Sequence, residues 1–403
     1  MKQALHGVKV LDLTQVMAGP FCTLLLGDLG ADVVKIEPPS GDSTRGMGGR
    51  QGTESTAFWA MNRNKRGMVL NLKHPQAQEL ARRLAAWTDI WVENYRPGVM
   101  DAFGLSYADL RQINPGLIYA SVSGFGATGP YAKKGGFDLV AQGMSGIMSV
   151  TGEEGRPPVK CGVPITDLGA ALFATQAILA AYIHRQNTGQ GQYIDTSLLE
   201  AGIALSIWES TQYFTRGEIP EPMGSAHRLS APYQAIKCAD GYINLGAANT
   251  RTWQRFAHAI GRPELLERPE YENERQRVLN RHLLTRDIED VTSIKSRAHW
   301  LAVLEEAGVP CGPILDYAEV FNDPHIQARG MVQEMDHPVG GKIQVLGPAV
   351  KLSETPARLT RRSPLFGEHT AELMRELGYA DAEIRELSEA GAVVLGEAEQ
   401  AAD

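Results

Sequence analysis

The first 125 residues alternate between short apolar runs and helical segments, and this alternation restricts the fold more than any other feature. "VKVLDLT" (8–14) is typical of a buried strand, "FCTLLLGDLGA" (21–31) of a helix, and "DVVKIE" (32–37) of a second strand. This order favours parallel pairing of the two strands. Further strands are expected at 67–72, 89–94 and 117–125, with helices at 75–87 and near 107–113. We therefore predict an α/β fold with a doubly wound, Rossmann-like large domain.

The length of the chain and a change in composition after residue 200 predict a second domain. A chain of 403 residues exceeds what one hydrophobic core usually supports. A segment rich in Pro, Gly and Ser (216–232) precedes the strand pair "YQAIKCADGYINLGA" (233–247) and several charged helices. The predicted parts are a large α/β domain (1–200), a linker (201–232), a smaller α+β domain (233–325) and a C-terminal segment (326–403) that returns to the large domain. A final helix at 370–379 is expected before a charged tail.

Composition and charge favour a folded cytoplasmic protein. The net charge is −8, and Lys and Arg are scattered, so nucleic-acid binding is disfavoured. The N-terminus lacks the apolar core of a signal peptide, and no membrane span is expected because Gln, Thr or Gly interrupt every long apolar stretch. The four cysteines lie far apart without a C-x-x-C spacing, which predicts free thiols and no zinc site.

Asp167 stands directly before a long apolar segment, 168–185, that we expect to be a helix buried on most sides. Two interpretations compete. Thr166 and Asp167 are good N-cap residues, and capping is the ordinary role of such side chains. Alternatively, Asp167 is a nucleophile at the mouth of the helix. A carboxylate ionised at neutral pH needs no general base to attack an activated acyl group. The residues alone leave both interpretations open.

Two further segments are candidates for ligand binding. Residues 123–158 hold nine glycines in thirty-six residues, and a long loop without secondary structure is usually functional. Asp138 in this loop is either a capping acid or a catalytic one. A basic cluster is either a phosphate-binding surface or a solvated loop, and it consists of Arg45, Arg50, Arg63, Lys65, Arg66 and Lys73.

In-order motifs over nearly the whole chain resemble the class III coenzyme A transferases, the formyl-CoA and carnitine CoA-transferase (CaiB/BaiF) family. The resemblance covers "VLDLTQVMAGPFCTLLLGDLGADVVKIEPPSGDSTRG" (10–46), "NRNKRGMVLNLK" (62–73), "VENYRPGVMDAFGLSY" (92–107), "GFDLVAQGMSG" (136–146), "GVPITDLGAALFA" (162–174) and "GQGQYIDTSLLEA" (189–201), and it continues through "LFGEHTAELMRELGY" (365–379).

The resemblance implies a CoA-transferase that moves coenzyme A from an acyl-CoA donor to a small carboxylic acid acceptor. It implies two chains interlocked as a homodimer, and no metal or separate prosthetic group. Asp167 falls on the family's nucleophile, which forms a mixed anhydride and then an aspartyl-CoA thioester. The implied coenzyme contacts are Val16, Met17, Ala18, Leu70, Lys73, Asn94, Tyr95, Phe137 and Asp138.

Departures from the family pattern narrow the activity. Formyl-CoA:oxalate transferases carry Gln at Met17 and Arg at Pro38 and Ala102, and they have a run of consecutive glycines that 221–232 lacks, so oxalate is disfavoured as acceptor. The α-methylacyl-CoA racemases carry a His base at the position of Phe137, and its absence here argues for a transferase. An oxidoreductase is disfavoured because G-x-G-x-x-G is missing after the first strand. A non-catalytic acyl-CoA binding protein would not need Asp167. On chemical type alone, Arg45, His227 and Arg228 are candidate contacts for a substrate carboxylate.

Overall fold

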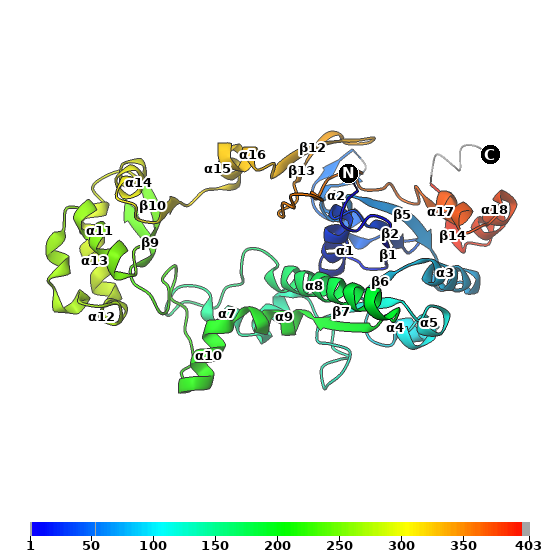
Figure 1. Cartoon of the computed structure of the whole chain (residues 1–403), viewed down its shortest axis with the longest axis horizontal. Helices are drawn as coiled ribbons and strands as arrows, with labels where there is room; N and C mark the ends of the chain where they lie inside the picture. The colour runs from blue at the N-terminus through cyan, green and yellow to red at the C-terminus, as the bar shows by residue number, and fades with distance from the viewer. Residues whose placement is uncertain (1, 53, 397–403) are drawn as a thin grey trace. The chain divides into compact units, whose positions relative to one another are not determined.

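The computed structural model describes residues 2–52 and 54–396, and it contains a mixed α/β unit built around a mainly parallel sheet (Figure 1). The strand order is β14-β5-β2-β1-β6-β7-β8, and only β14 runs antiparallel to its neighbour. The strands are β1 (Lys9–Asp12), β2 (Asp32–Glu37), β5 (Lys65–Leu70), β6 (Ile90–Glu93), β7 (Ile118–Ser123), β8 (Tyr193–Ser197) and β14 (Val393–Val394). The predicted parallel strands are confirmed.

The chain forms two compact units. Unit 1 comprises Met1–Met148, Lys160–Glu218 and Pro324–Asp403, and unit 2 comprises Ser149–Val159 and Ile219–Asp323. The large sheet belongs to unit 1. The C-terminal stretch belongs there as well, because β14 pairs with β5.

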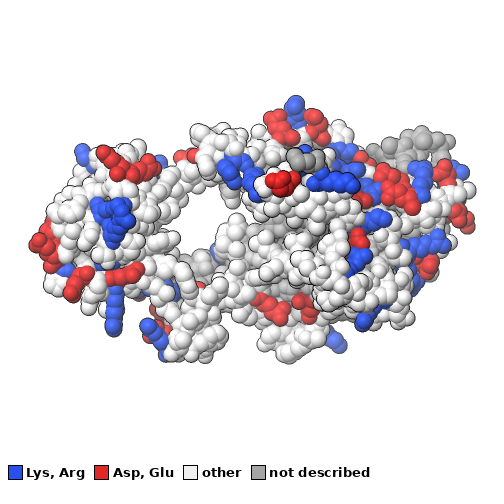
Figure 2. All heavy atoms as spheres, viewed as in Figure 1, with Lys and Arg blue, Asp and Glu red and all other residues white. Residues whose placement is uncertain are grey.

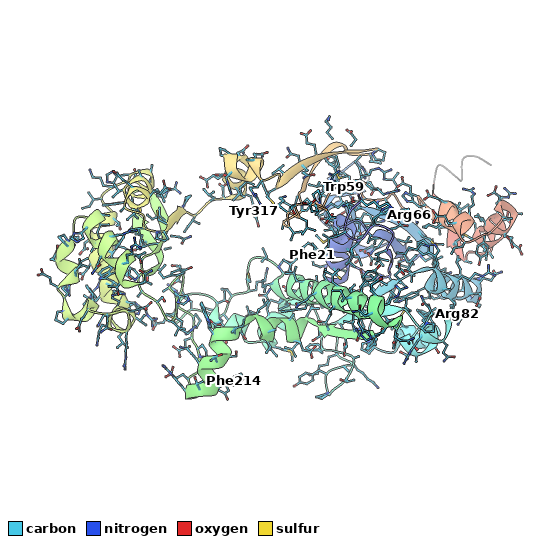
Figure 3. The ribbon with its side chains drawn as sticks, in the orientation of Figure 1. Phe21, Trp59, Arg66, Arg82, Phe214 and Tyr317 are labelled. Carbon is cyan, nitrogen blue, oxygen red and sulfur yellow. The ribbon has the colours of Figure 1, made fainter. Side chains whose placement is uncertain are left out.

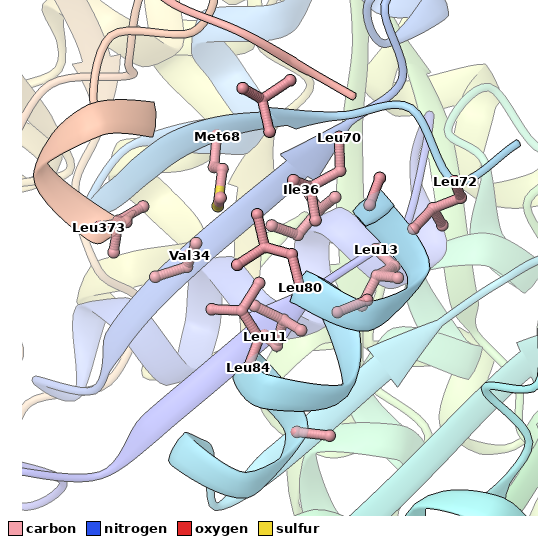
Figure 4. Packing of buried hydrophobic residues seen from close by; sticks show 14 of the residues in the cluster. Leu11, Leu13, Val34, Ile36, Met68, Leu70, Leu72, Leu80, Leu84 and Leu373 are labelled. Carbon is pink, nitrogen blue, oxygen red and sulfur yellow. The ribbon is translucent and has the colours of Figure 1, made fainter. Parts of the chain in front are cut away.

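Alternate residues of the strands serve two separate cores, one on each face of the sheet. Leu11, Val34 and Met68 face a core covered by α3 (Pro75–Trp87), α5 (Tyr107–Ile113), α17 (Thr370–Glu376) and α18 (Asp381–Glu389). Figure 4 shows the packing of this core. Val10, Val33 and Ile90 face the other core, which is covered by α1 (Ala18–Asp28), α8 (Ile165–Thr188) and α9 (Leu198–Leu205). Both faces are therefore dry, as expected for a parallel sheet.

Helix α8 is longer than predicted and less buried. It ends at Gly189, which adopts the left-handed conformation of a C-cap. Ala170, Ala174 and Ile178 are fully buried, whereas Leu172 and Ile183 on the other side are 55% and 63% exposed. The expectation that α8 is buried on most sides is therefore wrong for this single chain. Its length and mean hydropathy would suffice for a membrane span, contrary to the sequence expectation, but one face packs in the core.

The glycine-rich segment contains two short helices, so the prediction of a long loop without secondary structure is wrong. They are α6 (Asp138–Met144) and α7 (Ile147–Val150), and Asp138 is the first residue of α6. The glycines serve close contacts here. A Cβ atom on Gly136 would lie 2.5 Å from the Cα atom of Gly124, so the two backbones cross at a distance that only glycine allows.

Unit 2 contains the predicted hairpin and charged helices. β9 (Tyr233–Cys238) and β10 (Gly241–Gly246) pair antiparallel, and β11 (Cys311–Pro313) adds to β10. Around them lie α11 (Thr250–Ala259), α12 (Glu274–Leu279), α13 (Arg281–Thr292) and α14 (Arg297–Glu306), whereas α15 (Tyr317–Asn322) lies apart from them, beyond β11. Trp253, Phe256 and Ile236 belong to a core of this unit alone.

The remaining elements of unit 1 are short. They are β3 (Arg50–Gln51), β4 (Glu54–Ser55), α2 (Thr56–Asn62), α4 (Val99–Ala102), α10 (Ile207–Arg216), α16 (Pro324–Ala328), β12 (Val332–His337) and β13 (Gly341–Leu346). The helical stretch that follows β8 is broken at Ser206 into α9 and α10. α18 was not predicted, because its residues were assigned to the charged tail.

Candidate active site

A cavity of about 410 Å³ opens at the carboxyl ends of β1, β6 and β7. The sheet order changes direction between β1 and β6, because β2 lies on one side of β1 and β6 on the other. Ligands of doubly wound sheets bind at such switch points. All the lining residues belong to unit 1, and they come from the β1–α1 turn, the segment after β6, the end of β7, the glycine-rich segment, α8 and α9.

Eight of the ten sequence-predicted site residues line this one cavity: Val16, Met17, Ala18, Asn94, Tyr95, Phe137, Asp138 and Asp167. The other two do not. The side chain of Leu70 packs in the core beside Leu80 and Ile36 (Figure 4), and Lys73 is exposed beyond the end of β5, two strands away from β1. A role of Leu70 through its side chain would require the core to open.

Asp167 is not the N-cap of α8. The helix begins at Ile165, its N-cap position is Pro164, and no side chain caps it from there. Asp167 is therefore the third helical residue and lies in the first turn. Within the described chain, no group donates a hydrogen bond to its carboxylate. The capping interpretation of Asp167 fails, and the carboxylate is left available at the cavity wall.

Asp138 makes the contacts that Asp167 does not. Its Oδ1 atom accepts hydrogen bonds from the backbone N–H of Thr166 at 3.0 Å and from Thr166 Oγ1 at 2.7 Å, so it caps α8 from a neighbouring helix. Its Oδ2 atom accepts from Gln142 Nε2 at 2.7 Å. Spacing along the sequence could not reveal this cap, because the two partners are 28 residues apart.

Burial, together with the nearby charge of Asp138, raises the pKa of Asp167 from 3.8 to about 7. The expectation of a fully ionised carboxylate at neutral pH is therefore wrong for the free chain. Near neutral pH the Asp167 carboxyl group therefore exchanges between its protonated and ionised forms. The ionised form is correspondingly more basic and more nucleophilic than an ordinary aspartate.

The basic cluster predicted from the sequence is mostly neither a phosphate surface nor a solvated loop. Lys65 pairs with Asp12 at 2.9 Å, and both side chains are fully buried. Three more members of the cluster are paired: Arg63 with Asp28, Arg66 with Asp32, Glu372 and Glu376, and Arg45 with Glu37 and Glu54. Arg50 and Lys73 are exposed. On the face shown in Figure 2, basic side chains of unit 1 are interspersed with acidic ones.

These pairs also argue against an oxidoreductase and remove Arg45 as a candidate contact for a substrate carboxylate. Glu37 stands where a ribose-binding acid of an oxidoreductase would be, but it is fully buried and accepts hydrogen bonds from Arg45 and from the backbone N–H of Asp42. Arg45 is held by Glu37 and lies 3.6 Å from the ring centroid of Phe58, so it does not line the cavity. His227 and Arg228 belong to unit 2, and Arg228 donates to Glu221 O at 2.8 Å.

Two cations at the cavity were not singled out from the sequence. Arg96 follows Asn94 and Tyr95, and Lys134 lies in the glycine-rich segment 3.8 Å from the ring centroid of Tyr131. Both are exposed, so they are free to turn toward an anionic ligand. The signal that could have found them is their position next to motifs already recognised. No histidine lines this cavity in the described part of the chain.

Cys22 is excluded as a nucleophile. It is fully buried on α1, and burial raises the pKa of its thiol to about 12. All four cysteines are free, and none of the described His, Cys, Asp and Glu side chains gather in threes that could hold a metal ion.

Known proteins similar to this chain share its length and its fold. The chain is 42% identical to the succinyl-CoA:glutarate CoA-transferase of Homo sapiens, over 96% of this chain and 90% of that protein. It is 37% identical to a formyl-CoA:oxalate CoA-transferase of Streptomyces coelicolor, over 97% and 99%. The crystal structure of a CAIB/BAIF family protein from Brucella suis matches with a TM-score of 0.83 and 38% identity, covering 94% of this chain and all of that one.

The model of CoA-transferase family III matches residues 5–370. Together with the relatives, this match confirms the resemblance seen in the motifs. The protein is a transferase enzyme whose substrates include CoA thioesters, and the chain belongs to CoA-transferase family III.

Proposed function

We propose that this enzyme moves coenzyme A between carboxylic acids with Asp167 as the nucleophile. The observation that supports the proposal most is the Asp167 carboxylate, which lines a cavity at the switch point of the sheet and accepts no hydrogen bond from the described chain. A carboxylate that the protein neither pairs nor uses as a cap is available for covalent chemistry.

The proposed reaction balances over four displacements. An Asp167 oxygen attacks the donor thioester carbonyl, and coenzyme A leaves as the thiolate, so a mixed anhydride forms. The thiolate attacks the Asp167 carbonyl, which gives an aspartyl-CoA thioester and releases the donor acid as its carboxylate. The acceptor carboxylate attacks this thioester, coenzyme A leaves again as the thiolate, and a second mixed anhydride forms. The thiolate then attacks the acceptor's acyl carbon, which releases the new acyl-CoA and restores Asp167.

The surroundings of Asp167 suit these intermediates. Anhydrides and thioesters hydrolyse when water enters, and burial beside the apolar first turns of α8 limits the water around the carboxylate. Arg96 and Lys134 supply positive charge at the same cavity for the anionic groups of the substrates. The exposed ring of Phe137 lines the cavity beside Gly136, where the backbone crosses that of Gly124.

For the substrates, we propose succinyl-CoA as donor and a small dicarboxylic acid as acceptor. The relative with 42% identity is named for succinyl-CoA and glutarate, and the one with 37% identity for formyl-CoA and oxalate. Met17 lines the cavity where oxalate-specific enzymes are expected to carry Gln, and this difference favours the longer acids. A racemase is disfavoured because a histidine base is missing from this cavity.

The enzyme is also proposed to work as an interlocked homodimer in the cytoplasm. Helix α10 has no buried residue in the single chain, and Ile207, Trp208 and Phe214 are exposed on it. Figure 3 shows Phe214 at the outer end of this helix. An exposed apolar surface of this kind marks an interaction site, and a second copy of the chain is the partner that the family resemblance implies.

Trapping the intermediate tests the nucleophile. The protein is incubated with succinyl-CoA and hydroxylamine without acceptor, and its peptides are analysed by mass spectrometry. We expect a hydroxamate on the peptide that contains Asp167, and Asp167→Asn should lose both this adduct and at least 1,000-fold in kcat, as for other covalent nucleophiles. Asp195→Asn is the matched control, since Asp195 lies outside the cavity. An active protein whose Asp167 peptide is never modified would refute the mechanism.

A further inference from the structure

Both polar atoms of the Asn94 side-chain amide form hydrogen bonds within the protein. Its Nδ2 atom donates to Gln15 O at 2.8 Å, and its Oδ1 atom accepts from Gln15 N at 2.8 Å. The parallel ladder between β1 and β6 ends just before, at Asp12 and Val92, with one more bond from Leu13 N to Val92 O. The Asn94 side chain therefore continues the ladder by one step, where the backbone of β1 has already turned away.

The turn held in this way contains a strained residue. Val16 has a φ angle of +70°, a left-handed conformation that is a rare outlier for a β-branched side chain. Such conformations persist only where surrounding contacts enforce them, and they gather at functional sites. Val16 is followed by Met17 and Ala18, and all three residues line the cavity of Asp167.

Both ends of the turn are fixed from the protein interior. At its start, the buried Lys35 donates to Thr14 O, and Asp12 Oδ1 accepts from Thr14 N at 2.9 Å. At its end, α1 packs so closely that a Cβ atom on Gly19 would lie 2.3 Å from Thr14 Cβ. Between these anchors, the paired hydrogen bonds of Asn94 hold the backbone of Gln15, the residue before Val16.

We propose that Asn94 is a positioning residue that clamps the β1–α1 turn, Gln15–Ala18, in the conformation that binds the coenzyme. The inference rests on the proposed function. It differs from the family resemblance, which places Asn94 among the coenzyme contacts themselves. In the clamp, the ligand is bound by the turn and by its neighbours, and Asn94 acts through Gln15 and Val16.

The first test compares Asn94→Ala with Asn114→Ala in the full-length chain. Asn114 is a matched control, because its Nδ2 atom also bonds backbone oxygens, Ala85 O and Thr88 O, but it does not line the cavity. Calorimetric titration with coenzyme A should show a dissociation constant raised about 10- to 30-fold by Asn94→Ala, as expected for two lost hydrogen bonds. Asn114→Ala should change it less than about 2-fold.

A second readout needs no ligand. Amide hydrogen exchange of the peptide that covers residues 13–18 should be faster in Asn94→Ala than in the natural chain, and unchanged in Asn114→Ala. If exchange stays slow while the affinity falls, Asn94 contacts the coenzyme directly and the clamp is refuted. If the natural chain does not bind coenzyme A, the proposed function is contradicted, while the exchange rates still decide whether the clamp exists.

The strain at Val16 provides a third test, which distinguishes a clamp that acts through the turn from a direct contact between Asn94 and the coenzyme. Glycine adopts positive φ readily, so Val16→Gly should make the turn less dependent on its clamp. We expect Asn94→Ala to weaken coenzyme binding less than about 5-fold when Val16→Gly is already present. Equal losses in both backgrounds would overturn the proposal. If Asn94→Ala does not fold, the isosteric Asn94→Asp, which lacks the donor to Gln15 O, takes its place in all three measurements, and an unchanged affinity and exchange rate would refute the clamp.

Discussion

At the scale of single residues, the raised pKa of Asp167 makes the proposed transfer depend on pH near neutrality. Because the ionised carboxylate is the nucleophile, kcat/KM for succinyl-CoA should rise with pH and level off above about 7, the pKa of this group. Asp138→Asn removes the neighbouring negative charge and should move this rise in kcat/KM to lower pH. Steady-state rates between pH 5 and 9 provide the measurement.

Asp195→Asn serves as the control for that shift, because Asp195 accepts the Ala127 N–H at 3.0 and 3.1 Å in the same unit but lies outside the cavity. Its profile should coincide with that of the natural enzyme. If kcat/KM of Asp138→Asn rises at the same pH as that of the natural enzyme, burial alone sets the pKa of Asp167.

The same pKa also predicts a gain in stability when Asp167 is replaced. The folded chain binds more protons at this site than the unfolded chain between pH 3.8 and about 7, so the free energy of unfolding falls as pH rises through this range. Asp167→Asn removes that penalty. Urea unfolding should show the variant more stable by roughly 2 kcal/mol at pH 8, by less than half as much at pH 5, and nearly equal to the natural chain only below pH 3.8. An equal difference at pH 8 and pH 5 would contradict this explanation.

The sequence identified Asp167 and most of the residues around it, but it did not reveal which acid caps α8. Both Asp138 and Asp167 are suitable capping residues by type. The choice between them depends on where α6 and α8 meet, and that is a tertiary contact between residues 138 and 166. Arg96 and Lys134 were missed for a related reason, because the cavity gathers them from two distant segments.

At the scale of elements, the apolar pattern predicted where the strands lie, but it did not predict the buried charged residues at the start of β5. β5 is predicted as an apolar strand at 67–72, whereas it begins at Lys65 and includes two of the six residues of the basic cluster. Every residue of β5 is buried, so the charges at its start must be paired inside the protein. Lys65 meets Asp12 of β1 and Arg66 meets Asp32 of β2.

This arrangement predicts that Lys65 is required for folding rather than for binding. Burial opposes ionisation of Asp12, yet Lys65 and Lys35 hold its pKa well below its usual value. Lys65→Met would leave Asp12 with one cation instead of two in a dry core. We expect a loss of about 3–5 kcal/mol in the free energy of unfolding, measured in urea.

Lys73→Met is the matched control for this loss, since Lys73 is exposed just beyond the same strand. It should change the free energy of unfolding by no more than about 0.5 kcal/mol. If Lys65→Met were equally mild, the buried pair would not be the reason for the charge at the start of β5.

At the scale of the whole molecule, the proposed interlocked dimer has a property that ordinary dimers lack. Two chains threaded through each other cannot separate without unfolding, so dilution should not dissociate them and subunits should not exchange. The exposed apolar residues of α10, among them Trp208 and Phe214, would then be covered by the partner chain. The dimer would thus account for the exposure of these residues in the single chain.

Mixing two differently tagged preparations tests this topology. Native mass spectrometry should find only homodimers of each tag after a day at 25 °C, and mixed dimers in the statistical ratio of about 1:2:1 only after joint unfolding and refolding. Trp208→Glu should lower the yield of dimer on refolding, because it places a charge in the contact, whereas Ile294→Glu, at an equally exposed apolar position in unit 2, should not. Mixed dimers that form within minutes under native conditions would show that the two chains are not linked.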